Sequence, residues 1–176
     1  MATEQSKTLE ALQSAIHMEI DGKEFYLKAS QKSSNDMGKK LLNKLALEED
    51  FHRQKFEQIY DAISKEKAWP ETDFKSDGGS ALRTIFASTL KEGSLDTNAA
   101  ITELDSVQAA MIMENKTYDF YKSQGKDATY STERDFYEAL AAQEREHYLI
   151  LLDYYEFLKD PAAWFVEKEH PSMDGG

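Results

Sequence analysis

The sequence repeats one pattern at a fixed distance, and this repeat constrains the fold more than any other feature. Residues 45–60 read LALEEDFHRQKFEQIY and residues 140–155 read LAAQEREHYLILLDYY, so both segments begin with Leu-Ala and end with Tyr. The spacing of 95 residues also relates a Glu and a His in each segment, namely Glu49 with Glu144 and His52 with His147. Such a repeat predicts two similar structural units.

The same spacing relates a second pair of segments, AIHMEIDGKEFY at residues 15–26 and AMIMENKTYDFY at residues 110–121. Five residue types agree between them: Ala15, Met18, Glu19, Phe25 and Tyr26 match Ala110, Met113, Glu114, Phe120 and Tyr121. In each half of the chain, the Glu of the first segment precedes the Glu of the second by 30 residues. We therefore expect the two units to place these acids at similar heights.

Helical periodicity extends over most of the chain. Apolar residues recur at helical spacing in four long stretches, about residues 5–32, 36–66, 98–124 and 132–159. A shorter helix is predicted at residues 80–88, within a connection that Gly and Pro residues interrupt. Two long hairpins joined by a long crossover are one arrangement of a four-helix bundle. The sequence thus predicts an all-α four-helix bundle over residues 1–160, a crossover at about 67–97, and a C-terminal tail at 161–176.

Turn and capping residues mark the ends of these helices. In the turn KSSND, residues 32–36, either Ser34 or Asn35 can cap the second long helix. Thr132 with Asp135 resembles a capping box at the start of the fourth. Pro161 is expected to end that helix.

Six polar residues are predicted to point into the bundle. Glu19, for example, shares a helical stripe with Leu12 and Tyr26 rather than lying on the solvated face. The full set is Glu19, Glu49, His52, Glu114, Glu144 and His147. Four unpaired carboxylates in an apolar core would strongly destabilise the fold, whereas two divalent metal ions would balance their charge. Oxygen and nitrogen ligands suit two iron ions or manganese, with zinc as a substitute.

Composition excludes several other kinds of protein. The net charge is −12 and the pI is about 4.8, which argues against nucleic acid or anionic lipid as a partner. The chain has no cysteine, so disulfides, Cys-ligated metal sites and thiol catalysis are excluded. Neither a signal sequence nor a membrane span is predicted from the sequence, and we expect a soluble, cytoplasmic protein.

In these residues the chain resembles the ferritin-like di-iron carboxylate proteins, and the rubrerythrin-like branch in particular. The shared pattern is one Glu, then Glu-x-x-His, then one Glu, then Glu-x-x-His, on four successive helices. The resemblance implies that Glu19 and Glu114 are terminal ligands and that Glu49 and Glu144 bridge two irons. His52 and His147 would each bind one iron.

The chain departs from well-known rubrerythrins in two respects. Those proteins carry a further carboxylate three residues after the third-helix ligand, where this chain has Thr117. They also carry a Cys-ligated rubredoxin domain, which a sequence without cysteine does not contain. A reaction of the rubrerythrin kind would therefore need electrons from a separate donor protein.

The resemblance implies three alternative functions. The first is an oxidoreductase that reduces hydrogen peroxide or dioxygen, with a role in oxidative stress. The second is a ferroxidase that handles iron as a ferritin does, and the third is a metal-stabilised structural module without turnover. We expect a homodimer or a larger homo-oligomer, and native mass should separate the first two functions.

Five further residues attract attention because of their type or position. Tyr26 and Tyr121 each follow a predicted ligand by seven residues, and they either pack in the core or donate a hydrogen bond to a ligand carboxylate. His17 lies off the acid-bearing stripe and is interpreted as structural. Glu167 and His170 form a third Glu-x-x-His, but Pro171 follows it and no symmetric mate exists, so it is interpreted as a solvated end segment.

Overall fold

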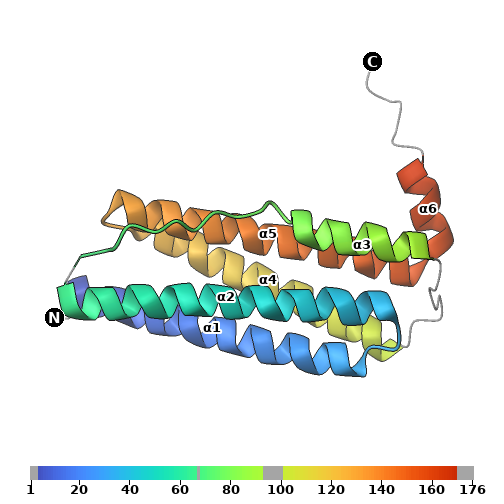
Figure 1. Cartoon of the computed structure of the whole chain (residues 1–176), viewed down its shortest axis with the longest axis horizontal. Helices are drawn as coiled ribbons and strands as arrows, with labels where there is room; N and C mark the ends of the chain where they lie inside the picture. Colours follow the sequence, from blue (N-terminus) through green and yellow to red (C-terminus); the bar gives the residue numbers. More distant parts are fainter. Residues whose placement is uncertain (1–3, 67, 93–100, 170–176) are drawn as a thin grey trace, which may run out of the picture.

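A computed structural model describes residues 4–66, 68–92 and 101–169, which form six helices (Figure 1). In order, these are α1 (Glu4–Lys32), α2 (Asp36–Glu66), α3 (Ser80–Glu92), α4 (Ile101–Asp127), α5 (Ser131–Lys159) and α6 (Pro161–Glu169). Helices α1 and α2 form one antiparallel hairpin, and α4 and α5 form a second one. The predicted all-α, ferritin-like bundle of two hairpins is confirmed.

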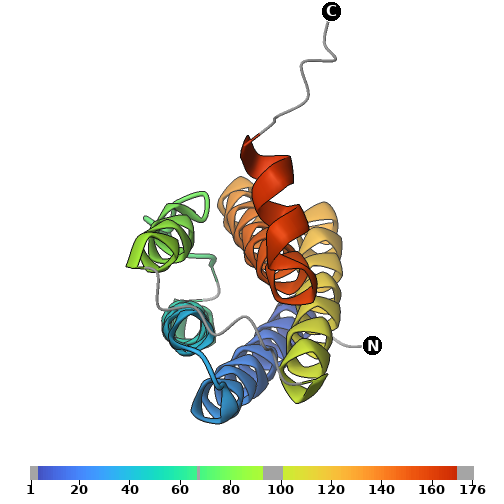
Figure 2. The ribbon, with the colours of Figure 1, turned by 90° about the vertical axis from the view of Figure 1, so that its right-hand side faces the viewer.

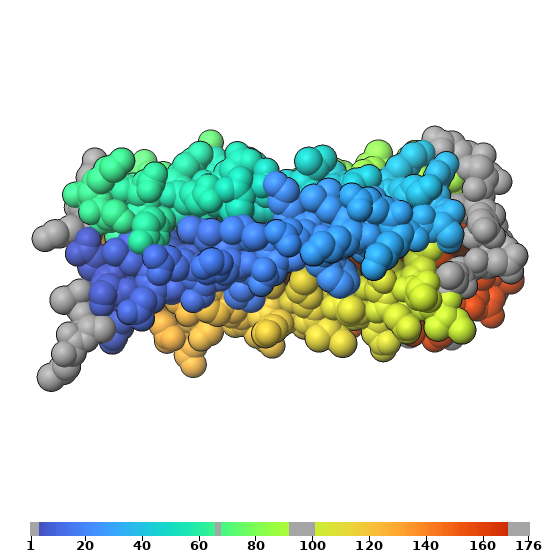
Figure 3. Space-filling model, turned by 90° about the horizontal axis from the view of Figure 1, so that it is seen from below, coloured from blue at the N-terminus to red at the C-terminus, as the bar shows by residue number. Residues whose placement is uncertain are grey.

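The hairpins meet through α1 and α4, while α3 lies against α2 and α5 on the other side of the bundle (Figure 2). Seen from the side of α1 and α4, the side chains of α1, α2 and α4 pack next to one another along the long axis (Figure 3). In the part of the chain that the structure describes, no helix combines the length and apolar character needed to cross a membrane.

Two apolar clusters divide the core along the bundle axis. One cluster lies toward the turn between α1 and α2 and includes Met37, Leu41, Val107 and Leu151. The other lies toward the opposite end and includes Leu12, Phe56, Phe136 and Leu140. Each of the four long helices passes from one cluster to the other, and its predicted ligands stand between them. The fold thus holds the polar residues in a layer with apolar packing on both sides.

The turn between α1 and α2 follows the predicted capping pattern. The Gly38 N–H donates to Oδ1 of Asn35 over 2.7 Å, so Asn35 caps α2. Glu103 on α4 closes the turn from the other hairpin, because its carboxylate accepts hydrogen bonds from the hydroxyls of Ser33 and Ser34.

The predicted capping box of Thr132 and Asp135 is wrong. Helix α5 begins at Ser131, and the carboxylate of Glu133 accepts backbone N–H groups from Thr129 at 3.1 Å and Tyr130 at 3.5 Å. An acid one turn into the helix can satisfy the free N–H groups that precede it. Glu133 and Asp135 both lie close to the start of α5, and the backbone places the Glu133 carboxylate within hydrogen-bond distance of these N–H groups.

Three other boundaries differ from the sequence prediction. Helix α3 continues to Glu92 and α4 to Asp127, each a few residues past the predicted end. Pro161 ends α5 as expected but also opens α6, where Asp160 Oδ1 accepts the Ala163 N–H over 3.0 Å. Trp164 of α6 is buried and packs among aromatic residues of α3 and α5. The predicted helix start at 98 and the crossover residues 67 and 93–97 lie outside the described residues.

Candidate metal centre

Six side chains from four helices meet in the polar layer between the apolar clusters. Helices α1 and α4 each contribute one Glu, and α2 and α5 each contribute a Glu and a His three residues later. All six are at most 3% exposed: Glu19, Glu49, His52, Glu114, Glu144 and His147. The 3.6-residue helical repeat puts Glu and His on one face of each helix, one turn apart.

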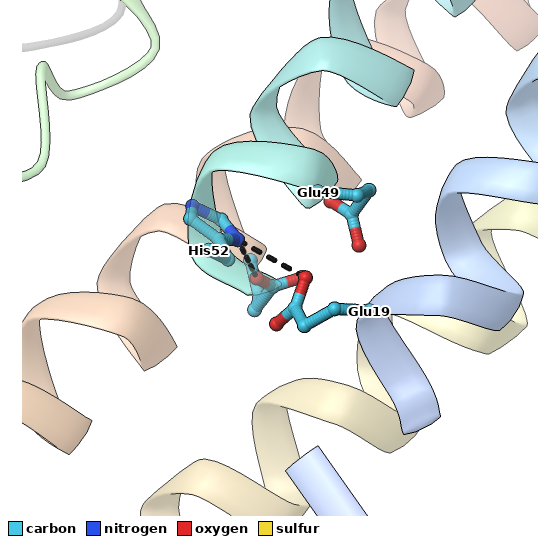
Figure 4. A group of neighbouring side chains, drawn as sticks. Glu19, Glu49 and His52 are labelled. Atoms are coloured by element: carbon cyan, nitrogen blue, oxygen red, sulfur yellow. Dashed lines mark ion pairs between the residues drawn. The ribbon is translucent and has the colours of Figure 1, made fainter. Parts of the chain in front are cut away.

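These side chains form two overlapping groups whose candidate ligand atoms all lie within 4.8 Å of one another. The first group consists of Glu19, Glu49, His52 and Glu144. The second group consists of Glu49, Glu114, Glu144 and His147. Figure 4 shows Glu19, Glu49 and His52 of the first group turned toward a common point between α1 and α2. Glu49 and Glu144 belong to both groups.

Nitrogen and oxygen atoms at the centre of this cluster are buried yet lack hydrogen-bond partners among the described residues. They are Glu19 Oε2, Glu49 Oε1, Glu114 Oε2, both oxygens of Glu144, and Nδ1 of both His52 and His147. His52 Nδ1 lies 3.3 Å from Glu19 Oε2 and 3.2 Å from Glu144 Oε1. His147 Nδ1 lies 3.3 Å from Glu49 Oε1 and 3.5 Å from Glu114 Oε2.

Such spacing fits shared metal ions. Ligands bound at about 2.1 Å from one ion stand roughly 3–3.5 Å apart, and buried polar atoms otherwise cost free energy when unpaired. The donor set of four carboxylates and two imidazoles suits iron or manganese. The residues present therefore fit a di-iron site.

Two buried tyrosines donate hydrogen bonds to Glu19 and Glu114 from the opposite hairpin. The hydroxyl of Tyr26 on α1 donates to Glu114 Oε1 on α4, and Tyr121 on α4 donates to Glu19 Oε1 on α1. Burial, and then the adjacent carboxylate, raises the pKa of each tyrosine well above its usual value. Both hydroxyls therefore stay protonated and can donate. Each tyrosine also belongs to an apolar cluster, so the structure shows core packing together with the hydrogen bond, which is directed across the bundle.

Burial also sets the proton affinities of the central acids. It raises the pKa values of Glu49 and Glu144 well above the usual range, and repulsion from a neighbouring carboxylate adds to the rise, from Glu144 at Glu49 and from Glu114 at Glu144. Burial acts in the same direction on Glu114, but the neighbouring His147 outweighs it and lowers the Glu114 pKa. Without metal, the layer therefore retains protons that a bound cation would displace.

The two imidazoles respond to the same acids. Burial alone would lower their pKa values, but Glu19 raises the pKa of His52, and Glu114 raises that of His147 well above its usual value. A metal ion needs the neutral imidazole, so metal binding must also release these protons.

The sequence analysis missed two buried residues beside His147. Glu48 Oε2 lies 2.8 Å from His147 Nε2 and accepts a hydrogen bond from the Gln143 amide over 3.0 Å. Burial tends to raise the Glu48 pKa, but the hydrogen bond with His147 lowers it to about 2. The 95-residue spacing relates Glu48 to Gln143, which is the signal that could have found them.

The remaining candidates lie apart from the cluster or make other contacts. Thr117 is buried, and its hydroxyl donates to the backbone carbonyl of Met113 over 3.1 Å. His17 is exposed on the outside of α1, away from the six buried residues. Glu167 is exposed on α6, and His170 lies outside the described residues.

Comparisons with known proteins agree with this geometry. The family model described as Rubrerythrin matches residues 10–155. A search of curated proteins found no match. A solved structure of a hypothetical protein from Pyrococcus furiosus is similar in fold, with a TM-score of 0.62 and 22% sequence identity, covering 87% of this chain and 90% of that one.

Proposed function

Because the chain belongs to the rubrerythrin family, we propose that it binds two iron ions and uses them to reduce hydrogen peroxide or dioxygen. The observation that carries this proposal is the convergence of buried, unpaired ligand atoms in two overlapping groups. The electrons would come from a separate donor protein.

In the proposed site, Glu49 and Glu144 would be shared by the two ions, because only these two acids belong to both groups. Glu19 and Glu114 would each hold one ion, since the tyrosine leaves the Oε2 atom of each without a partner. His52 and His147 each supply one Nδ1 atom. Four carboxylates then balance two divalent ions, so the buried layer becomes neutral.

The bound ions would supply two electrons together, which reduce hydrogen peroxide and two protons to two molecules of water. The protein residues shape the surroundings of this reaction. Apolar clusters on both sides restrict the access of bulk water to the layer. Tyr26 and Tyr121 fix the orientation of the terminal carboxylates by holding one oxygen of each.

Anaerobic loading with ferrous iron, followed by stopped-flow mixing, tests this function. The chain should bind two ions, and one equivalent of peroxide should oxidise both faster than dioxygen does. The Glu49→Ala variant is the control, since it should lose the response along with the metal. Peroxide that leaves the ferrous protein unchanged for minutes would contradict the peroxidase proposal.

A second candidate function is ferroxidase activity, in which ferrous iron itself is the substrate. Thr117 favours keeping this candidate, because its hydroxyl binds a backbone carbonyl and it offers no further carboxylate to the site. A ferroxidase should oxidise many more than two irons per chain in air, and storage of the product requires a closed shell of many subunits. Iron turnover and native mass separate it from a peroxidase, for which we expect a homodimer or a small oligomer.

A further inference from the structure

The two histidines of the metal centre have similar places but different supports. Their rings are nearly parallel, with centroids 5.8 Å apart and an interplanar angle of 12°. Both turn Nδ1 toward the carboxylates. Nε2 of His147 meets the Glu48 carboxylate at 2.8 Å, whereas Nε2 of His52 has no hydrogen-bond partner among the residues that the structure describes. The His52 ring instead meets Phe74 of the crossover edge-on, at 5.6 Å between centroids.

The cause of this difference lies in the sequence repeat. The 95-residue spacing relates His52 to His147 and also Glu48 to Gln143, so two equivalent positions carry one carboxylate and one amide. Both side chains are 7% exposed. The amide donates to the carboxylate over 3.0 Å, which turns it toward Glu48 and leaves His52 without an equivalent acceptor. One hairpin therefore supports the histidine of the other, without a reciprocal contact.

We propose that Glu48 is a positioning residue that makes the two metal positions unequal, so that the position of Glu114 and His147 fills first. This inference rests on the proposed two-metal site. A carboxylate that accepts the outer N–H of an imidazole fixes the ring and strengthens the opposite nitrogen as a ligand; loss of such a partner costs about 10–100-fold in metal affinity. The position of Glu19 and His52 lacks this support and fills second.

A purely structural role for Glu48 makes a different prediction. Glu48 also pairs with Lys44 of the same helix at 3.2 Å, and its hydrogen bond from Gln143 joins α2 to α5 of the other hairpin. If that were its only role, its removal would lower stability and weaken both metal positions alike. A positioning role changes the order of filling.

Zinc titration of the full chain distinguishes these roles. Calorimetry should give two steps that differ by at least about tenfold in affinity. Nitrogen NMR of the histidine rings, in a chain with only four histidines, should show His147 shifting with the first equivalent and His52 with the second. In Glu48→Ala, the first step should weaken about 10–100-fold while the second stays within about threefold. Lys44→Ala is the matched control and should leave both steps unchanged.

An exchange variant protects the test against simple unfolding. Glu48→Gln combined with Gln143→Glu keeps the composition, net charge and buried amide–carboxylate pair, and it should move the preference to His52. Simultaneous filling in the natural chain, or His52 filling first, would overturn the inference while leaving the two-metal site intact. An exchange variant that still fills at His147 would also overturn it. Failure of the natural chain to bind zinc would remove the proposed site and this inference together.

Discussion

The hairpin of α1 and α2 and the hairpin of α4 and α5 carry the same residue types at the candidate ligand positions and at the two tyrosines. Each supplies a Glu, a Glu-x-x-His pair and a tyrosine that binds the carboxylate of the other hairpin. The residues directly behind these side chains differ between the hairpins. There, Gly22 in the first hairpin corresponds to Thr117 in the second, and Glu48 corresponds to Gln143.

This difference shows where the proposed metal pair constrains the chain. Two ions that shared Glu49 and Glu144 would require matching ligands from both sides, which accounts for the symmetry at those positions. The positions behind the ligands adjust individual side chains, and each can differ between hairpins without loss of the set. We therefore expect substitution of a candidate ligand to remove one or both ions, and substitution of a residue behind the ligands to change one metal position more than the other.

The largest effect should follow removal of a proposed bridging acid. Glu49→Ala or Glu144→Ala should reduce bound iron from two ions to nearly none, because each acid belongs to both ligand groups. Glu19→Ala and Glu114→Ala are the comparison, since each belongs to one group and should preferentially lose one ion. Metal analysis after dialysis gives the count. One ion retained at full affinity in both bridging variants would contradict the bridging assignment.

A smaller loss of metal affinity is expected from a substitution at Gly22, for which its counterpart Thr117 is the comparison. A Cβ at Gly22 would lie 2.7 Å from Glu49 Oε2, so Gly22→Ala must displace that carboxylate from its position. We expect metal affinity to fall by about tenfold or more, as for other changes next to a ligand. Thr117→Ala removes a hydroxyl that is bound to the backbone, and it should change affinity little.

Thermal unfolding with and without zinc provides the second measurement for this pair. In the metal-free Gly22→Ala protein, the helix propensity gain of up to about 1 kcal/mol opposes an overpacking cost of about 1–3 kcal/mol. The net change should therefore be modest without zinc and larger with it, because only the bound ion requires Glu49 in place. Equal losses in both states would mean that the methyl group disturbs the fold rather than the ligand.

The next prediction concerns stability, whose dependence on pH should reverse when the metal is removed. In the metal-free chain, raised pKa values of Glu49 and Glu144 mean that the folded state holds extra protons above the ordinary value of 4.5. Stability is therefore lost as pH rises from there. The raised pKa values of the histidines act in the same direction, since their contribution is present below 6.5 and is lost as pH rises through the folded-state values. The lowered pKa values of Glu48 and Glu114 matter only at more acidic pH.

The melting temperature should thus fall between about pH 5 and pH 9 without metal, while the additional stability conferred by zinc should grow because protons compete less for the ligands. The double change Glu49→Gln and Glu144→Gln should flatten the metal-free curve, since it keeps the surface charge and removes the central titration. A metal-free melting temperature that rises steadily over this range would contradict the assigned pKa directions.

The six candidate ligands could be predicted from the sequence, because their spacing along each helix is a local pattern and the chain repeats it. Each Glu and the His three residues after it lie in line with apolar residues of their helix, which predicts that they face inward, and the 95-residue spacing showed the same arrangement twice. The structure brings all six predicted residues together.

Contacts that depend on the relative position of elements were less accessible. The pairing of Glu48 with His147 joins α2 to α5 and needs the exact height of both helices. The choice of Glu133 over Asp135 at the start of α5 depends on how the preceding turn bends. By contrast, α6 carried a local signal, Asp160 followed by Pro161, which is a cap and first-turn pattern. Its stability comes from Trp164 packing on α3 and α5, which helical periodicity does not show.

The smallest effect on metal binding is expected from the two tyrosines, for which the hairpins are symmetric. Tyr26→Phe and Tyr121→Phe each remove one hydroxyl that holds the outer oxygen of a terminal carboxylate, whose other oxygen remains free for the ion. Both variants should therefore retain two ions and most of the stabilisation by zinc. Each should slow reoxidation of the ferrous protein by about 10–100-fold, because the carboxylate loses its fixed orientation. Single-turnover stopped flow measures the rate. If reoxidation is unchanged in both, the tyrosines serve only in packing, and if only one variant is slowed, the asymmetry behind the histidines extends to the terminal acids.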